Sequence, residues 1–157
     1  MDKRKTFSKN LYKANDKKGK ESAIELFTQI FALKNIPVQK ELYKAGDLKF
    51  HDCDGIEFIV EAEVKNVGWT DKGFKYKTLH FAYKPLTDSD YFVSFNGECD
   101  KAFICSKEQL IQDKNVIYKN TFNKNNGQST KNEPFYEIKI SDCEYYIKES
   151  DRWHEEN

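Results

Sequence analysis

The chain has 157 residues, of which 38% are hydrophobic and 33% are charged, and its formal net charge is zero. This length suits one domain, and the 12 Phe, 9 Tyr and 2 Trp supply the core that a disordered chain would lack. No apolar run approaches the roughly 18 residues of a membrane span, and the N-terminus lacks the apolar segment of a secretion signal. We therefore expect a cytoplasmic protein that does not associate with a membrane.

The N-terminal segment is strongly basic. Residues 1–20 hold eight lysine or arginine side chains against two aspartates, which gives a net charge of +6. We expect residues 1–18 to form a flexible basic arm that attracts a polyanion, and residues 19–157 to form the single folded domain. A solvated terminus that aids solubility explains the same charge.

An amphipathic helix is expected from Gly19 to Lys34. Its large apolar residues fall on one broad helical face, whereas Glu21 and Glu25 lie on the polar side. Pro37 ends this pattern, because proline lacks a backbone donor and disfavours a helical conformation in the residue before it.

Three extended segments follow the helix. We expect strands at residues 38–43, 47–50 and 57–66. A tight turn that contains Gly55 connects the second strand to the third. If these two strands form an antiparallel hairpin centred near Gly55, Asp47 lies opposite Glu63 and both side chains point to the same face.

The third of these strands, from Glu57 to Asn66, alternates apolar and charged residues with a period of two. It would bury one face and place Glu61, Glu63 and Lys65 on the other. Burying these charges without partners would cost free energy, so we expect a metal ion to bind the carboxylates. An ordinary solvated strand face with cross-strand pairs is the alternative interpretation.

The rest of the chain is expected to hold further strands and one short helix. The expected elements are an extended segment at 74–84, strands at 91–96 and 101–105, a helix at 107–111 capped by Ser106, strands at 116–122 and 135–140 around a polar loop, and a short final element at 144–148. The pattern indicates a domain that contains more strand than helix.

The order of these elements and the spacing of their charged residues resemble the PD-(D/E)XK nuclease superfamily. The shared features are Asp47 at the head of one strand, Glu63 sixteen positions later, Lys65 two positions further, and an acidic helix before them. The resemblance covers about residues 18–111. It implies an α/β fold with a restriction endonuclease-like core, in which helices flank a mixed central β-sheet, here with an additional C-terminal β-hairpin.

The resemblance implies a Mg²⁺-dependent DNA endonuclease of the restriction, repair, recombination or phage type, with Mn²⁺ as a substitute for Mg²⁺. Asp47, Glu63 and the backbone carbonyl of Val64 would hold the metal ion. Lys65 would orient the attacking water or stabilise the transition state. The residue types suit this chemistry, because hard carboxylates bind Mg²⁺ and the ion neutralises charge that builds on phosphoryl oxygens.

Members of the superfamily often add a glutamate from the first helix. Glu21 and Glu25 are four residues apart on the polar side of the expected helix, and both are candidates. The preferred candidate is Glu25.

Two features depart from the family pattern. Gly46, rather than a proline, precedes Asp47, and Glu61 adds a further carboxylate to the row. The choice of Glu63 over Glu61 rests on the two-residue step from Glu63 to Lys65.

Lysine and aromatic residues gather after the Glu-x-Lys strand. We expect this segment to contact DNA, because lysines follow a phosphate backbone and an aromatic ring stacks on an unpaired base. The candidate residues are Trp69, Lys72, Lys75, Lys77 and Lys84. Many members of the superfamily dimerise to cut both strands, so the resemblance also implies a homodimer.

Two other classes of function remain open. A module of the same fold that has lost cleavage would bind nucleic acid or a protein partner. An unrelated α/β interaction protein would use the charged row as ordinary surface. The presence of Asp47, Glu63 and Lys65 together favours the nuclease.

Overall fold

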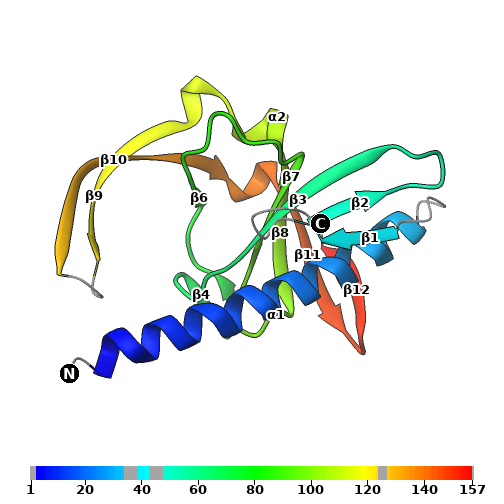
Figure 1. Cartoon of the computed structure of the whole chain (residues 1–157), viewed down its shortest axis with the longest axis horizontal. Coiled ribbons are helices and arrows are strands. Elements are labelled where there is room, and N and C mark those ends of the chain that lie inside the picture. The colour runs from blue at the N-terminus through cyan, green and yellow to red at the C-terminus, as the bar shows by residue number, and fades with distance from the viewer. Residues whose placement is uncertain (1–2, 34–38, 43–47, 124–126, 157) are drawn as a thin grey trace.

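The computed structural model describes residues 3–33, 39–42, 48–123 and 127–156. The chain starts with one long helix, α1 (Lys3–Leu33), and the second α-helix, α2 (Lys107–Leu110), is a single turn (Figure 1). The described residues also include two short 3₁₀ helices in connections, η2 (Asp113–Asn115) and η3 (Ile140–Asp142). The remaining described elements are strands, so the fold is a mixed α/β fold with few helices.

A seven-stranded sheet forms the centre of the molecule, in the order β1-β2-β3-β7-β8-β11-β12. Its strands are β1 (Gln39–Leu42), β2 (Leu48–His51), β3 (Glu57–Val64), β7 (Tyr91–Phe95), β8 (Lys101–Ser106), β11 (Glu144–Glu149) and β12 (Arg152–Glu156). Only the β3–β7 pair among these neighbours is parallel. The expected mixed sheet is therefore confirmed, whereas a restriction endonuclease-like core stays a prediction.

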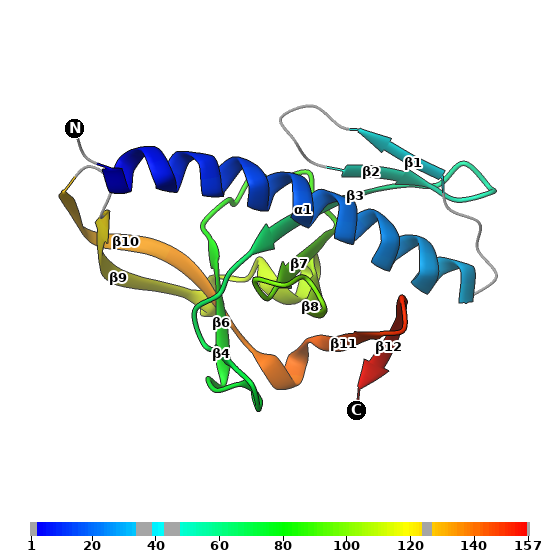
Figure 2. The ribbon, with the colours of Figure 1, turned by 90° about the horizontal axis from the view of Figure 1, so that it is seen from below.

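Helix α1 packs across one face of this sheet (Figure 2). Leu26 and Phe27 are buried in the core beneath the helix, as the amphipathic pattern predicts. The Phe27 ring stacks on Phe50 of β2 at 5.7 Å between centroids, and Phe50 stacks on Phe58 of β3 at 5.4 Å. Because these aromatic rings are buried on a single face of the sheet, they fix which face of β3 points away from the helix.

Helix α1 begins at Lys3, so the expected start at Gly19 is wrong. Gly19 lies within the helix, where a Cβ atom would come within 3.1 Å of Cγ2 of Val64. The glycine lets the helix pass close over β3 instead of ending it. The N-terminal half of α1 extends beyond the sheet (Figures 1 and 2). The division into a flexible arm of residues 1–18 and a domain of residues 19–157 stays a prediction.

The opposite face of the sheet packs against a second, three-stranded sheet of order β6-β10-β9, and Leu110 of α2 is buried in the same core. Its strands are β6 (Thr78–Ala82), β9 (Val116–Asn123) and β10 (Gln128–Lys139), and a two-stranded ribbon of β4 (Trp69–Thr70) and β5 (Gly73–Phe74) precedes β6. The extended segment expected at 74–84 is thus divided between β5 and β6. The polar loop expected between residues 122 and 135 is shorter, because β10 starts at Gln128.

Two hairpins follow α2. The β9–β10 hairpin curves away from the central sheet toward the side where the N-terminal half of α1 lies (Figure 1). The β11–β12 hairpin turns at Ser150 and Asp151, whose φ angles of 50° and 64° are those of a tight two-residue turn. Strand β12 was not expected from the sequence, and its buried Trp153 belongs to the core beneath α1.

Within the described ranges, no helix combines the length and the apolar character that crossing a bilayer requires. The cytoplasmic location stays a prediction.

Candidate functional site

Strand β3 has the two-faced character that its sequence predicts. Phe58 and Val60 are buried in the core beneath α1, and Ala62 and Val64 pack against the same core. The alternate residues Glu61, Glu63 and Lys65 therefore lie on the face directed toward β6. Lys65 directly follows β3, and its backbone N–H donates to the carbonyl of Phe95. The backbone of Lys65 is therefore still hydrogen-bonded to the neighbouring strand β7.

Glu63 and Lys65 are in direct contact. Lys65 Nζ lies 3.2 Å from Oε1 of Glu63. That oxygen is enclosed by protein and accepts no hydrogen bond of good geometry, although the Glu63 side chain as a whole keeps 29% of its surface exposed. Burial raises the pKa of Glu63 above its ordinary value, and the Lys65 ammonium opposes this rise. The Glu63 carboxylate thus has the Lys65 ammonium and the Ser94 hydroxyl beside it, while its enclosed Oε1 accepts no hydrogen bond of good geometry.

Lys65 also connects β3 to the second sheet. Its ammonium donates a hydrogen bond to the backbone carbonyl of His80 in β6 and lies 5.8 Å from the centre of the Phe81 ring. The lysine side chain is 41% exposed. Its charge is therefore positioned by two elements and remains open to a ligand.

The hairpin of β2 and β3 does not have the expected register. Leu48 pairs with Val60 and Phe50 with Phe58, whereas a hairpin centred at Gly55 would pair Leu48 with Ala62. The turn is closed by the N–H of Asp52, which donates to the carbonyl of Ile56, so Gly55, with φ of 80°, is the last residue of a three-residue loop.

The predicted opposition of Asp47 and Glu63 assumed a register that differs by two residues from that of the described part of this hairpin. Asp47 itself lies outside the described residues. Its role as a metal ligand stays a prediction.

Glu61, the extra carboxylate of the row, has a partner of its own. Its Oε1 accepts a hydrogen bond from Lys84 Nζ, which follows β6. The Lys84 side chain remains 49% exposed. Glu61 is thus engaged in a cross-element ion pair, and the predicted DNA contact of Lys84 would have to compete with that pair.

The structure does not bring the helix glutamates to Glu63. Glu25 forms an ion pair of 2.8 Å with Lys148 of β11, and Glu21 is exposed. Helix α1 covers the face of β3 opposite to Glu63, because it packs on Val60 and its neighbours. The site is therefore composed of strands, with no contribution from α1 near the Glu63 carboxylate.

A second group of charged residues, which sequence reasoning did not find, lies beside Lys65. Lys119 Nζ on β9 donates to Nδ1 of His80 at 2.8 Å, and the Nε2–H of a neutral His80 donates to Oε2 of Glu137 on β10 at 2.8 Å. Burial, and after it the nearby Lys65 ammonium, lower the pKa of Lys119. The three residues are far apart in the sequence, and only the pairing of β6, β10 and β9 brings them together.

A cavity of about 550 Å³ opens next to these two groups. Trp69 and Lys77, two of the predicted DNA contacts, line it. Lys75 does not, but its ammonium lies 5.1 Å from the centre of the Tyr76 ring. Lys72 is exposed in the turn between β4 and β5 and lines a different depression.

A divalent cation would find oxygen donors of the right chemistry at β3. Glu63 offers an enclosed oxygen without a hydrogen bond, and Glu61 lies two residues before it on the same face. Hard carboxylate oxygens are the ligands that Mg²⁺ prefers. Within the described ranges, no group of three His, Cys, Asp or Glu side chains is close enough to hold a metal ion. The described donors therefore fit the ion in type but need a further ligand.

Comparison of the chain with protein-family models, with curated proteins and with solved structures found no match. The resemblance to the PD-(D/E)XK superfamily thus rests on the residues and the element order alone.

Proposed function

We propose that the chain is a Mg²⁺-dependent DNA endonuclease, with Glu63 and Lys65 at the centre of its active site. One observation carries this proposal: the enclosed, incompletely hydrogen-bonded oxygen of Glu63 lies 3.2 Å from the ammonium of Lys65 on one face of β3. A carboxylate buried beside a positioned lysine is characteristic of sites in which the local environment shifts a pKa for function.

Each residue has a chemical task that its surroundings support. Glu63 and Glu61, with the backbone carbonyl of Val64 and with Asp47, would hold the cation. When bound, the cation neutralises charge that develops on the phosphoryl oxygens. Lys65 places a positive charge beside the scissile phosphate and holds the attacking water, and its bond to the carbonyl of His80 fixes its direction.

The charge of the chain supports a polyanionic substrate. The first 20 residues carry a net charge of +6, and α1 starts at Lys3 and extends beyond the sheet (Figure 1). A helix of this charge attracts DNA through the release of counterions from the phosphate backbone. A homodimer that cuts both strands belongs to the same proposal.

A catalytically silent module that binds nucleic acid is the second candidate. It is favoured by the two contacts that the Lys65 ammonium already makes, one with Glu63 and one with the carbonyl of His80. In that case the pair would serve to position β3 against β6, and binding would proceed without cleavage.

The test uses purified protein with supercoiled plasmid, linear duplex, single-stranded and branched DNA, in Mg²⁺, Mn²⁺ or EDTA. The proposal expects cleavage in either metal and none in EDTA, with activity lost in Glu63→Gln and Lys65→Met. Glu98→Gln, at an exposed position in the turn after β7, is the matched control and should cut like the wild type. Salt-sensitive binding in Ca²⁺ without cleavage in Mg²⁺ would instead identify the silent module.

A further inference from the structure

The cavity beside Lys65 has a lining that the proposed cleavage chemistry does not use. It measures about 550 Å³ and lies between the end of β3, the β4–β6 segment and the strands β9 and β10. Its lining residues include Lys65, Trp69, Tyr76, His80, Lys119 and Glu137. This volume is within the range of about 300 to 1,000 Å³ that is usual for sites that enclose small organic ligands.

The lining of the cavity holds more cationic than anionic side chains. Three lysines, Lys65, Lys77 and Lys119, stand against the single carboxylate of Glu137, which leaves a net charge of +2 on the lining when His80 is neutral. Lys119 is held by Nδ1 of His80 and lies 4.4 Å from the centre of the Phe135 ring. Two ammonium groups that face one cavity repel each other, and an anion between them removes this repulsion.

The lining also holds three aromatic rings that contact one another. The Tyr76 ring meets Phe74 edge to face at 5.8 Å, and Phe74 meets Trp69 in the same manner at 5.1 Å. Gly68, with φ of 90°, lies beneath both rings, since a Cβ atom there would come within 2.7 Å of Phe74 and 2.8 Å of Tyr76. Tyr76 nonetheless keeps 47% of its surface exposed. The exposed part of the ring, beside the Lys75 ammonium 5.1 Å from its centre, is a surface on which a base can stack.

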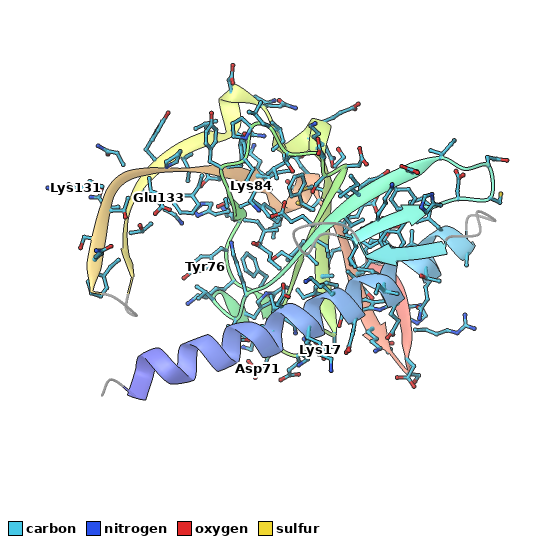
Figure 3. The ribbon with its side chains drawn as sticks, in the orientation of Figure 1. Lys17, Asp71, Tyr76, Lys84, Lys131 and Glu133 are labelled. Carbon is cyan, nitrogen blue, oxygen red and sulfur yellow. The ribbon has the colours of Figure 1, made fainter. Side chains whose placement is uncertain are left out.

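Tyr76 precedes β6 and lies on the side of that strand where the curved β9–β10 hairpin rises (Figure 3). Lys84 lies at the other end of β6, beside β3 (Figure 3). Tyr76 is thus separated from the Glu61–Lys84 pair by the length of the strand. Lys65 and Ser94 both line the cavity and both contact Glu63.

We infer that this cavity receives one unpaired nucleotide of a DNA strand, with its phosphate between Lys65 and Lys119 and its base stacked on Tyr76. The inference rests on the proposed function in taking DNA as the ligand. It narrows the substrate to strands with an unpaired base, such as single strands, flaps and branched junctions. A base inside an intact duplex is stacked on both sides and cannot present its face to a protein ring without being extruded.

Because Lys65 also contacts Glu63, a nucleotide in the cavity would place the adjoining phosphodiester beside the proposed catalytic carboxylate. The cavity would therefore select the substrate and set the position of the cut in one step. Holding the strand at a fixed place relative to the reacting groups is itself a large contribution to rate.

The test measures fluorescence anisotropy of a 5′-labelled 12-nucleotide single strand, and of the same sequence as a duplex, in EDTA so that no cleavage occurs. The wild type should bind the single strand more tightly than the duplex. Tyr76→Ala should weaken single-strand binding by about 5-fold to 100-fold, the range expected for one stacked base. Lys119→Gln should weaken it and reduce the salt dependence by about one phosphate contact.

Matched controls separate the cavity from the general surface. Tyr118→Ala, at a β9 tyrosine that is 66% exposed and outside the cavity lining, and Lys114→Gln, at an exposed lysine of η2, should both bind like the wild type. Tyr76→Phe should retain binding because it keeps the ring. Circular dichroism melting of every variant reports whether the fold is intact.

The inference is overturned if Tyr76→Ala binds the single strand as well as Tyr118→Ala does, or if the duplex binds as tightly as the single strand. It is also overturned if the unlabelled deoxynucleotide binds but the strand does not, since the cavity would then take a free nucleotide. Cleavage in Mg²⁺ is scored separately. If Tyr76→Ala weakens single-strand binding but the wild type does not cleave DNA, the proposed endonuclease is wrong and this inference stands. If the wild type and Tyr76→Ala bind and cleave the single strand equally, this inference is wrong and the proposed endonuclease stands.

Discussion

Glu63 Oε1 and Lys65 Nζ lie 3.2 Å apart on the same face of β3, and the opposite face of that strand is buried beneath α1. The pair is adjacent because residues two apart in a strand project in the same direction. It is partly desolvated because β6 lies over it, where the carbonyl of His80 accepts from Lys65. The fold thus places two opposite charges in contact at a partly desolvated position.

Replacing Glu63 by glutamine should change the pH dependence of stability. Burial raises the pKa of Glu63 above 4.5, so the folded state binds this proton more tightly than the unfolded chain does. Ionisation of Glu63 therefore lowers the free energy of unfolding as the pH rises from about 4.5 through the raised pKa. Glu63→Gln avoids this loss, so its stability relative to the wild type should increase with pH over that window. Urea denaturation at several pH values measures it, and a pH-independent difference would contradict it.

Replacing Lys65 by methionine should destabilise the protein at neutral pH. The Glu63 carboxylate would lose its only cation within 4 Å among the described ion pairs, and its pKa should rise further. The expected loss is about 1 to 3 kcal/mol, the usual penalty for leaving a buried polar group without a partner. The double variant Glu63→Gln/Lys65→Met should recover part of this loss, and strict additivity in the double-mutant cycle would contradict the coupling.

Neutralising lysines near the start of α1 should weaken DNA binding in a salt-dependent manner. The triple variant Lys5→Gln, Lys9→Gln and Lys13→Gln should reduce the slope of log K against log salt concentration by up to about 0.9 for each lost phosphate contact. Anisotropy titrations at several salt concentrations measure the slope. A matched triple variant at exposed positions elsewhere, Lys114→Gln, Lys139→Gln and Arg152→Gln, should leave it unchanged. Equal effects of the two triples would show that only total charge matters.

Introducing a side chain at Gly19 should strain the crossing of α1 over β3. A Cβ atom added at Gly19 would lie 3.1 Å from Cγ2 of Val64, so the larger side chain of Gly19→Leu should lower the free energy of unfolding by about 1 to 3 kcal/mol. Lys17→Leu, at an exposed position of the same helix, is the control. Urea denaturation of both variants provides the comparison. A Gly19→Leu variant as stable as the wild type would mean that the helix does not approach β3 closely.

The sequence predicted the parts of this structure that depend on local patterns. The period-two alternation of β3 assigned Phe58 and Val60 to the core and Glu63 to the other face, because a half-buried strand requires that alternation. Ser106 forms the predicted cap of α2, accepting from the N–H of Gln109, because this residue type satisfies the free donors of a helix start.

Other features depend on contacts that a local pattern does not contain. Gly19 suggested the start of a helix. It lies inside α1 instead, where the absence of a side chain lets the helix approach Val64 closely. Gly55 suggested the centre of a hairpin, but its positive φ closes a three-residue loop and shifts the register. The Lys119–His80–Glu137 group joins three strands distant in sequence, so spacing carried no signal for it.

Metal-dependent cleavage by the Glu63 and Lys65 variants tests the central claim most directly. A single-stranded and a branched DNA substrate are incubated with wild type, Glu63→Gln, Lys65→Met and the Glu98→Gln control, in Mg²⁺ and in EDTA, and the products are resolved on denaturing gels. We predict cleavage by the wild type and the control in Mg²⁺ alone, with a loss of at least about 100-fold in each site variant. Cleavage by Glu63→Gln and Lys65→Met at the rate of the wild type would contradict the assignment of this pair as the active site.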